Sequence, residues 1–298
     1  MAGEVDLHIH SNKSSDGDHS PAELINLAKS HGFKAIAIAD HDTVAAYPEA
    51  MNLAAEAGVE LIPSVELTTL LNGREFHLLL PFMNWESAGL LNLIARVHQA
   101  RFEEAKERVA KLQSLGFDIE WADVNRGEAS PPLGVVIAQA LLTKNSSRRD
   151  PRLAKYFESF SLGRAPYIFY EDYFREGRPA YVPKKIASIL DVLPQAAEFG
   201  AAPVLAHPGA DFELASYDDL CRLKERGLVG LEVFSTYHDE EQTAFYWQLA
   251  KQLDLVPTAG SDFHGKIKPH VSFGLIQDGA YWMVEALRER TRRVKKCP

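Results

Sequence analysis

The sequence has few cysteines and no long apolar stretch. Cys221 and Cys297 are the only two thiols in 298 residues, too few for the disulfide framework of a small secreted protein. No apolar run reaches the ~18 residues that a membrane-spanning helix needs. The chain enters a predicted strand at once, without the basic region, apolar segment and cleavage site of a secretory signal. These absences predict a cytoplasmic protein with no membrane partner.

Positive charge is also scarce. The chain has 32 Lys and Arg against 41 Asp and Glu, a formal net charge of −9, which argues against a broad surface for long nucleic acid. Bound divalent metals would reverse this balance locally, since three ions add about six positive charges. The acidity therefore does not exclude a small anionic substrate. We also find no G-x-S-x-G elbow, Walker loop or cysteine placed as a nucleophile.

The first strand places two histidines side by side. Val5, Leu7 and Ile9 are apolar and alternate with polar residues, which is typical of a strand. Side chains repeat every two residues along a strand, so His8 and His10 share one face. Such a pair supplies half of the ligands of a metal site. An isolated H-x-H is weak evidence, and the remaining ligands must come from elsewhere in the chain.

Strands and helices alternate at both ends of the chain. Seven strands are predicted, six of them tied to helices, which favours an α/β fold with a closed or nearly closed parallel barrel. The predicted strands are 5–9, 34–39, 59–63, 75–80, 203–206, 228–234 and 255–259. The alternation stops in the middle of the sequence, where a long charged helix and several prolines follow. We therefore expect a barrel from residues 1–97 and 181–298, with an inserted, mostly helical subdomain at 98–180.

Nitrogen and oxygen donors recur where these strands end. Each has an ordinary explanation when taken alone, because strand-end Asp often caps a helix and a buried His is usually a core residue. The C-terminal ends of barrel strands meet on one side, so the donors should converge. Imidazole and carboxylate without thiolate suit Mn, Fe or Zn, and their number requires about two or three ions. The candidates are His8, His10, Asp16, His41, Glu66, His77, His207, Asp262 and His264.

Five segments together resemble the polymerase and histidinol phosphatase (PHP) family. They are D-L-H-I-H-S…S-D-G, I-A-I-A-D-H-D, the segment around Glu66, L-A-H-P-G, and A-G-S-D-F-H-G…K-P-H. The insert and the stretch G-R-P-A-Y-V-P at 177–183 resemble the family's stand-alone phosphoesterases, which act on nucleoside phosphates or RNA ends. The resemblance implies a distorted (β/α)7 TIM-like barrel with a trinuclear metal site, and an insert that caps the substrate.

The resemblance also implies how the ligands are shared. The first ion would be held by His8, His10, Glu66 and Asp262. The second would share Glu66 as a bridge and add His77 and His207. The third would take Asp16, His41 and His264. Mn²⁺ is the expected metal, with Fe²⁺ or Zn²⁺ as alternatives.

The sequence departs from the family pattern at two places. One extra residue separates His10 from Asp16, so Asp18 or His19 is an alternative third-metal ligand. In the family an Arg-Pro-His-Ile-Ala stretch directs its side chains at the substrate's second phosphate or base. In this sequence Gly134-Val-Val-Ile-Ala138 stands in its place. This replacement leaves the substrate preference open.

These features predict a metal-dependent phosphoesterase. It would hydrolyse a phosphomonoester or terminal phosphodiester of a nucleotide-like small molecule or short oligonucleotide, with a metal-bridged hydroxide as nucleophile. Catalytic candidates are Asp262, His238 and Arg178, and substrate-binding candidates are Arg178, Lys268, His270 and His238. The alternatives are a C–N hydrolase of the amidohydrolase type and a non-catalytic metal-binding domain. No obligate protein partner is predicted.

Overall fold

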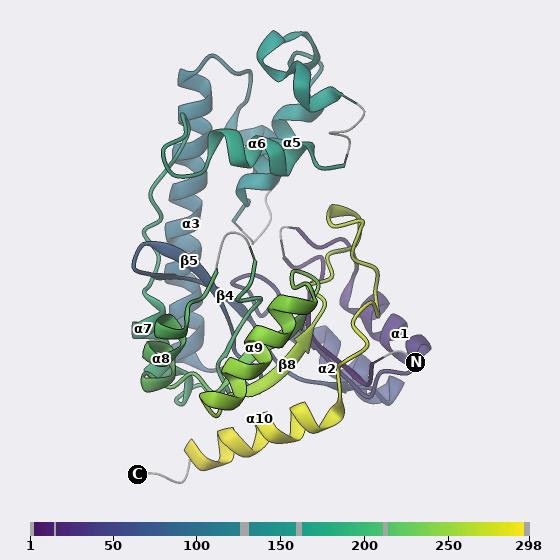
Figure 1. Cartoon of the computed structure of the whole chain (residues 1–298). Helices are drawn as coiled ribbons and strands as arrows, with labels where there is room; N and C mark the ends of the chain where they lie inside the picture. Colours follow the sequence, from purple (N-terminus) through teal and green to yellow (C-terminus); the bar gives the residue numbers. More distant parts are fainter. Residues whose placement is uncertain (1–2, 15, 126–130, 159–162, 211–213, 295–298) are drawn as a thin grey trace. The chain divides into compact units, whose positions relative to one another are not determined.

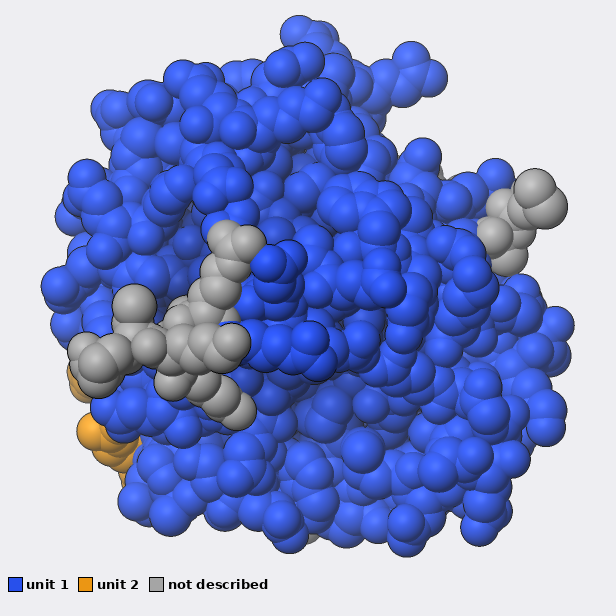
Figure 2. Space-filling model, turned by 90° about the horizontal axis from the view of Figure 1, so that it is seen from below, with its two compact units in different colours: residues 1–95, 187–298 blue, residues 96–186 orange. Residues whose placement is uncertain are grey.

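The computed structural model describes residues 3–14, 16–125, 131–158, 163–210 and 214–294. The chain forms two compact units. Unit 1 contains residues 1–95 and 187–298, and unit 2 contains residues 96–186; Figure 2 colours them blue and orange. No helix among the described residues is long and apolar enough to cross a membrane.

Unit 1 begins with a small parallel sheet. Its strands are β1 (Val5–Ile9), β2 (Ala35–Ile38) and β3 (Glu60–Leu61), paired in that order. The crossover helices are α1 (Pro21–His31) and α2 (Tyr47–Ala57). The start of α1 is fixed by a capping box in which Ser20 and Glu23 each bond the other's backbone, as Ser-Pro-x-Glu predicts. This half of the unit follows the predicted strand–helix alternation.

The second sheet is mixed, and here the prediction of a parallel barrel is wrong. Its strands pair in the order β4 (Glu66–Leu71), β5 (Arg74–Leu79), β6 (Val204–Leu205), β7 (Gly230–Ser235) and β8 (Val256–Gly260). The strand β5 is antiparallel to both β4 and β6, while β6, β7 and β8 are parallel. The sequence analysis overlooked β4, which forms a hairpin with β5 through Asn72 and Gly73 at φ +53° and +79°. Asn-Gly favours this tight hairpin turn.

The α/β class is confirmed, but strand pairing does not close the predicted barrel. The described strands lie in two sheets. Single parallel bridges connect the sheets, Ile9 with Phe263 and His41 with Glu66. Donor residues therefore stand at both seams between the sheets.

The remaining helices of unit 1 pack around the second sheet. They are α7 (Ile189–Ala196), α8 (Tyr217–Glu225), α9 (Glu240–Gln252) and α10 (Tyr281–Val294), and Figure 1 shows α9 in front of β8. Buried small and branched side chains from both sheets, including Val5, Ala37 and Val204, form a core with Val284 and Leu287 of α10. This packing holds the strand ends that carry the polar residues.

Unit 2 is helical in its described residues. The helix α3 (Ala88–Ser114) begins in unit 1 and continues into unit 2, where α4 (Trp121–Val124), α5 (Gly134–Thr143) and α6 (Ala165–Tyr173) follow. Two 3₁₀ segments, η1 (Ser147–Arg149) and η2 (Pro151–Phe157), lie between α5 and α6. Leu112, Leu141, Tyr156 and Phe169 are buried together, so unit 2 has a hydrophobic core of its own.

Candidate metal centre

All nine predicted donors converge in unit 1, and each is buried. Every one is at most 8% exposed. They come from β1 and the loop after it, the segment following β2, the start of β4, β5, and the segments following β6 and β8. Eight of the nine form three overlapping groups within which the donor atoms lie no more than 4.8 Å apart. The ninth, His207, lies beside Glu66. Parts of the chain separated by some 250 residues thus meet at one place.

The first group contains His8, His10, Glu66 and Asp262. His10 Nε2 lies 3.2 Å from Glu66 Oε2 and 3.1 Å from Asp262 Oδ1. His8 Nε2 lies 3.3 and 3.5 Å from the same oxygens, and 3.2 Å from His10 Nε2. Atoms bound about 2.1 Å from a tetrahedral ion lie about 3.4 Å apart. The spacing of this group therefore fits one metal ion.

Glu66 also faces a second set of donors with its other oxygen. Glu66 Oε1 lies 2.9 Å from His77 Nδ1 and 3.1 Å from His207 Nε2. Oε2, which faces the first group, is also 3.0 Å from His41 Nδ1. A carboxylate with one oxygen toward each set has the geometry of a bridging ligand.

The third group is built around Asp16. Asp16 Oδ2 lies 3.1 Å from His264 Nε2 and 3.5 Å from His41 Nε2, and His10 completes the group. The alternative ligands are engaged elsewhere: Asp18 Oδ1 lies 2.6 Å from His19 Nδ1, and Asp18 Oδ2 accepts a bond from the Lys266 N–H. The structure thus places Asp16, rather than Asp18 or His19, among the donors.

The electrostatics of the centre favour a bound cation. Burial raises the pKa of the Glu66 carboxyl, but His41, His8 and His77 outweigh burial and hold that pKa well below its usual range. Burial, together with the charges of His10 and Lys268, lowers the pKa of His264 to about 4. Glu66 Oε2 and Asp262 Oδ1 are buried without a hydrogen bond within the described residues. Such buried acceptors are costly unless a cation or water satisfies them.

Backbone strain is concentrated around these donors. Six described non-glycine residues have positive φ, and three of them are Asp42 at +51°, His207 at +23° and Asp262 at +54°. Such conformations cost roughly 1–3 kcal/mol each and persist where the surrounding structure imposes them. Two of the three are donors, and Asp42 adjoins His41, so the strain fixes the directions of the side chains in the centre.

The comparisons with known proteins agree with this geometry. A family model described as "PHP domain" matches residues 6–161. The chain belongs to the PHP domain family.

Several of its relatives are phosphoesterases. This PHP protein is 30% identical over 276 residues to the phosphoribosyl 1,2-cyclic phosphate 1,2-diphosphodiesterase of Eggerthella lenta, covering 90% of this chain and 97% of the relative. It is 26% identical over 274 residues to the 3′,5′-nucleoside bisphosphate phosphatase of Chromobacterium violaceum, covering 87% of each chain. A solved structure of a Bifidobacterium adolescentis protein, assigned as a metal-dependent phosphoesterase, matches with a TM-score of 0.80, 28% identity and 97% coverage of both chains. The PHP protein is a metal-dependent hydrolase of phosphoester bonds.

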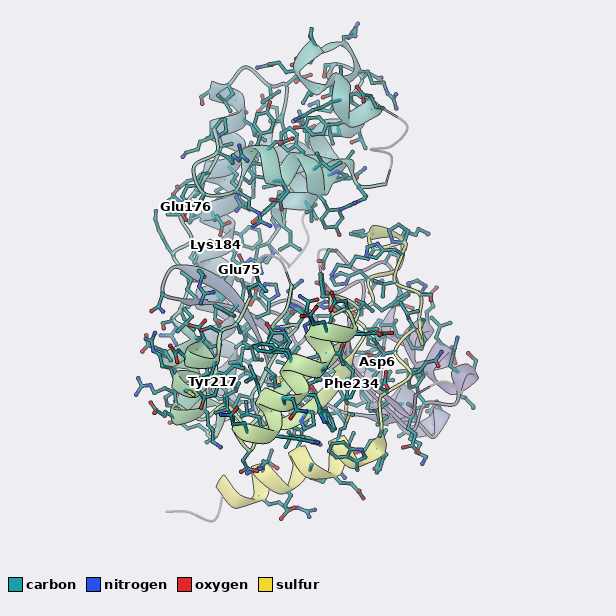
Figure 3. The ribbon with its side chains drawn as sticks, viewed as in Figure 1. Asp6, Glu75, Glu176, Lys184, Tyr217 and Phe234 are labelled. Atoms are coloured by element: carbon teal, nitrogen blue, oxygen red, sulfur yellow. The ribbon has the colours of Figure 1, made fainter. Side chains whose placement is uncertain are left out.

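Two carboxylates outside the nine donors tie the strand ends together. Asp6 of β1, labelled in Figure 3, accepts bonds at Oδ1 from the His8 and Ser261 N–H groups at 3.2 and 3.0 Å. Asp40 accepts bonds of 2.6 Å each from the N–H and hydroxyl of Ser11. Burial raises the pKa of both carboxyls to about 6. These bonds hold β1 against the ends of β8 and β2.

Sequence reasoning missed Glu232 and Tyr237. Glu232 Oε2 lies 2.8 Å from His8 Nδ1. The signal was a single charged residue inside the apolar run G-L-E-V-F of β7. The ring of Tyr237 is tilted against that of His207, with centroids 5.0 Å apart, and the Tyr237 hydroxyl accepts a 2.7 Å bond from Lys268 Nζ. Lys268 also forms an ion pair with Asp262, so the predicted phosphate-binding lysine lies beside the donors.

The other predicted substrate residues are placed differently. His238 Nδ1 donates to the Val233 carbonyl at 2.7 Å, and Nε2 accepts from the Gly209 N–H at 2.9 Å. Burial lowers the pKa of His238. A neutral ring with both nitrogens bonded to backbone favours a structural role for His238 over the predicted catalytic one. His270 is exposed in unit 1, and Arg178 is exposed in unit 2.

Proposed function

We propose that this PHP protein hydrolyses a phosphate ester on a nucleotide-like small molecule or short oligonucleotide. The observation that carries the proposal is the buried convergence of nine donors: eight form three overlapping groups, two of which share Glu66, and His207 lies beside Glu66. We propose two or three divalent ions, since imidazoles and carboxylates without thiolate suit Mn²⁺, Fe²⁺ or Zn²⁺. Mn²⁺ is the ion expected from the PHP resemblance. The nine donors are proposed as ligands in the three sets that the PHP resemblance implies.

Bound ions would supply Lewis acidity, lowering the pKa of water and neutralising charge on the phosphoryl oxygens. The side chains of the protein have separate tasks. Asp262 and Glu66 present buried carboxylate oxygens, which offset the charge of the ions. Lys268 sits between Asp262 and Tyr237 with its side chain 13% exposed, so its ammonium group is placed to meet a phosphate oxygen. Arg178 and His270 stay proposals for phosphate binding.

The substrate class is proposed from what two relatives have in common. One acts on a phosphoribosyl cyclic phosphate and the other on a nucleoside bisphosphate. Both names describe phosphate carried on ribose. We therefore propose a phosphorylated ribose as the unit that the protein recognises.

Three further proposals concern the whole chain. The single bridges between the two sheets support a distorted barrel, built from the eight described strands in place of the seven predicted from the sequence. The separate core of unit 2 is consistent with a subdomain at 98–180 that caps the substrate. A cytoplasmic location and the lack of an obligate protein partner stay predictions.

A phosphate-release screen tests the proposed function. Metal-free protein would be reconstituted with Mn²⁺ and assayed on nucleoside monophosphates, 3′,5′-bisphosphates, a ribose cyclic phosphate, 5′-phosphorylated dinucleotides and glycerol phosphate. For the cyclic ester, ring opening would be followed by chromatography. We expect at least one ribose ester to react more than tenfold faster than glycerol phosphate, and only with metal. Equal rates on all esters, or rates independent of metal, would refute the proposal.

A further inference from the structure

We propose that Glu232 is a positioning residue of the metal centre, which fixes the tautomer and orientation of His8. This inference rests on the proposed metal-binding role of His8. Glu232 lies on β7 and is 1% exposed, and its Oε2 is 2.8 Å from His8 Nδ1. At the opposite side of the ring, His8 Nε2 faces Glu66 and Asp262.

The two ring nitrogens of His8 therefore have different tasks. A carboxylate accepts but does not donate, so Nδ1 must carry the proton of its bond to Glu232. The neutral ring then leaves the lone pair of Nε2 directed at the first group of donors. A carboxylate behind a metal-bound imidazole also raises the basicity of the ligand nitrogen. Glu232 thus orders His8 before any ion arrives.

A purely structural role explains Glu232 less well. A carboxylate without a partner is expensive to bury, and an apolar residue of similar size is usually no worse for stability. Leu231 and Val233 are fully buried on the opposite face of β7, and Glu232 is itself 1% exposed, so an apolar side chain would suit this position. Glu232 Oε1 is buried with no hydrogen bond within the described residues. The carboxylate is incompletely satisfied in itself, and its one bond is directed at a proposed ligand.

The adjacent strand leaves space for this pair. A Cβ added to Gly260 of β8 would clash with His8 Cβ and lie 2.8 Å from Glu232 Oε2. The absence of a side chain at Gly260 therefore allows the histidine and the carboxylate to approach each other. Three strands contribute to the arrangement: β1, β7 and β8.

The chain contains a second pair that serves as a matched control. His77 Nε2 lies 2.9 Å from Glu75 Oε1, while His77 Nδ1 faces Glu66. Glu75, labelled in Figure 3, has a side chain that is 21% exposed, against 1% for Glu232. Water can replace Glu75 as an acceptor more readily than it can replace Glu232. The same substitution should therefore have a smaller effect at Glu75.

The test compares Glu232→Gln with Glu75→Gln. Glutamine keeps the size and one acceptor oxygen but removes the charge. Metal affinity would be measured by titrating Co²⁺ against a chelator and following its visible absorption, with kcat and KM measured for the Mn²⁺ form. We expect Glu232→Gln to weaken metal binding about 10–100-fold, shift the Co²⁺ spectrum and lower kcat more than it changes KM. For Glu75→Gln we expect the metal affinity to fall by less than about threefold.

The outcomes separate this inference from the proposed function. If Glu232→Gln leaves both the metal affinity and the Co²⁺ spectrum unchanged, this inference is overturned and the proposed function is unaffected. Metal binding that depends on Glu232 in a protein that hydrolyses no phosphate ester would support the inference and refute the function. A wild type that binds no divalent ion would overturn both.

A measurement on the wild type keeps the inference falsifiable if the variant does not fold. Histidine-selective ¹⁵N NMR of the Zn²⁺-loaded protein should show His8 protonated at Nδ1. A His8 ring protonated at Nε2 would contradict the role of Glu232.

Discussion

Asp262 illustrates how single residues in this protein combine strain with function. Its backbone has φ +54°, and its side chain contacts both His10 and Lys268. Burial raises the pKa of its carboxyl, but Lys268, His264 and His8 outweigh burial and keep that pKa well below the usual range. The residue therefore presents a charged oxygen to the centre at every physiological pH.

The substitution Asp262→Asn should abolish phosphate-ester hydrolysis while the protein stays folded. Asparagine tolerates the left-handed backbone conformation better than most residues and keeps the shape of the side chain. Only the charge and one acceptor oxygen are lost. Hydrolysis would be measured with the best ribose ester of the screen, and folding by circular dichroism. More than a few per cent of the wild-type rate in a folded variant would contradict the role of Asp262.

A substitution of His238 distinguishes a structural role of this residue from a catalytic one. The change His238→Ala removes two bonds to backbone, at Val233 and Gly209, and should lower the free energy of unfolding by about 2 kcal/mol. Because neither nitrogen is available as a proton donor, kcat of the folded fraction should stay within about threefold of wild type. Urea unfolding and kinetics at a temperature where the variant is folded would check both expectations. A loss of kcat above about 100-fold would restore the catalytic assignment.

The residue scale also shows what the sequence can reveal. The donors could be predicted because most of them stand in recognisable motifs where predicted strands end, while His77 lies within the predicted strand 75–80 and Asp16 in the loop after the first strand. Glu232 could not, because a lone carboxylate within an apolar strand has no sequence partner; its partner His8 lies 224 residues away. Only the folded chain brings the two together.

At the scale of elements, the hairpin β4–β5 decides how Glu66 and His77 meet. The antiparallel register pairs His77 with Thr68, two residues along from Glu66. The sequence analysis placed strand 75–80 correctly but missed β4, because E-L-T-T-L-L lacks clear alternation. Local periodicity identifies a strand without revealing its neighbour or direction. The Asn72-Gly73 turn was the available signal.

Helix α8 is attached to this hairpin through one carboxylate. Asp219 accepts a 2.6 Å bond from Arg74 of β5 and bonds from the N–H and hydroxyl of Ser216 at the start of α8. Burial raises the pKa of Asp219, but the bonds from Arg74 and Ser216 outweigh burial and lower it overall. The charged form of Asp219 is therefore favoured in the folded state. Its stabilising effect is present at pH values above the pKa that the Asp219 carboxyl has in the unfolded chain.

The change Asp219→Asn should destabilise the fold by about 1–2 kcal/mol at pH 7. A group with a lowered folded pKa loses its contribution as pH falls through that value. The difference between variant and wild type should therefore shrink below about pH 4. Urea unfolding at several pH values would measure it. A difference that is constant with pH would show that the charge of Asp219 does not stabilise the fold.

At the scale of the whole molecule, sequence analysis predicted the α/β class and the meeting of the donors at one place, but it also predicted a closed parallel barrel, which strand pairing does not form. The two seams are single bridges at Ile9 and at His41, and no local pattern encodes such isolated contacts. The metal centre nevertheless draws on both sheets. Binding ions there should couple the sheets, because ions that bind only the folded state stabilise it.

Anomalous diffraction from crystals grown with Mn²⁺ tests the central claim most directly. Scattering at the manganese edge locates the ions without reference to the assigned ligands. The account predicts two or three peaks, each within about 2.5 Å of several of the nine donors, with one carboxylate oxygen of Glu66 beside each of two peaks. No peak among these side chains, or manganese bound only at another part of the chain, would contradict it.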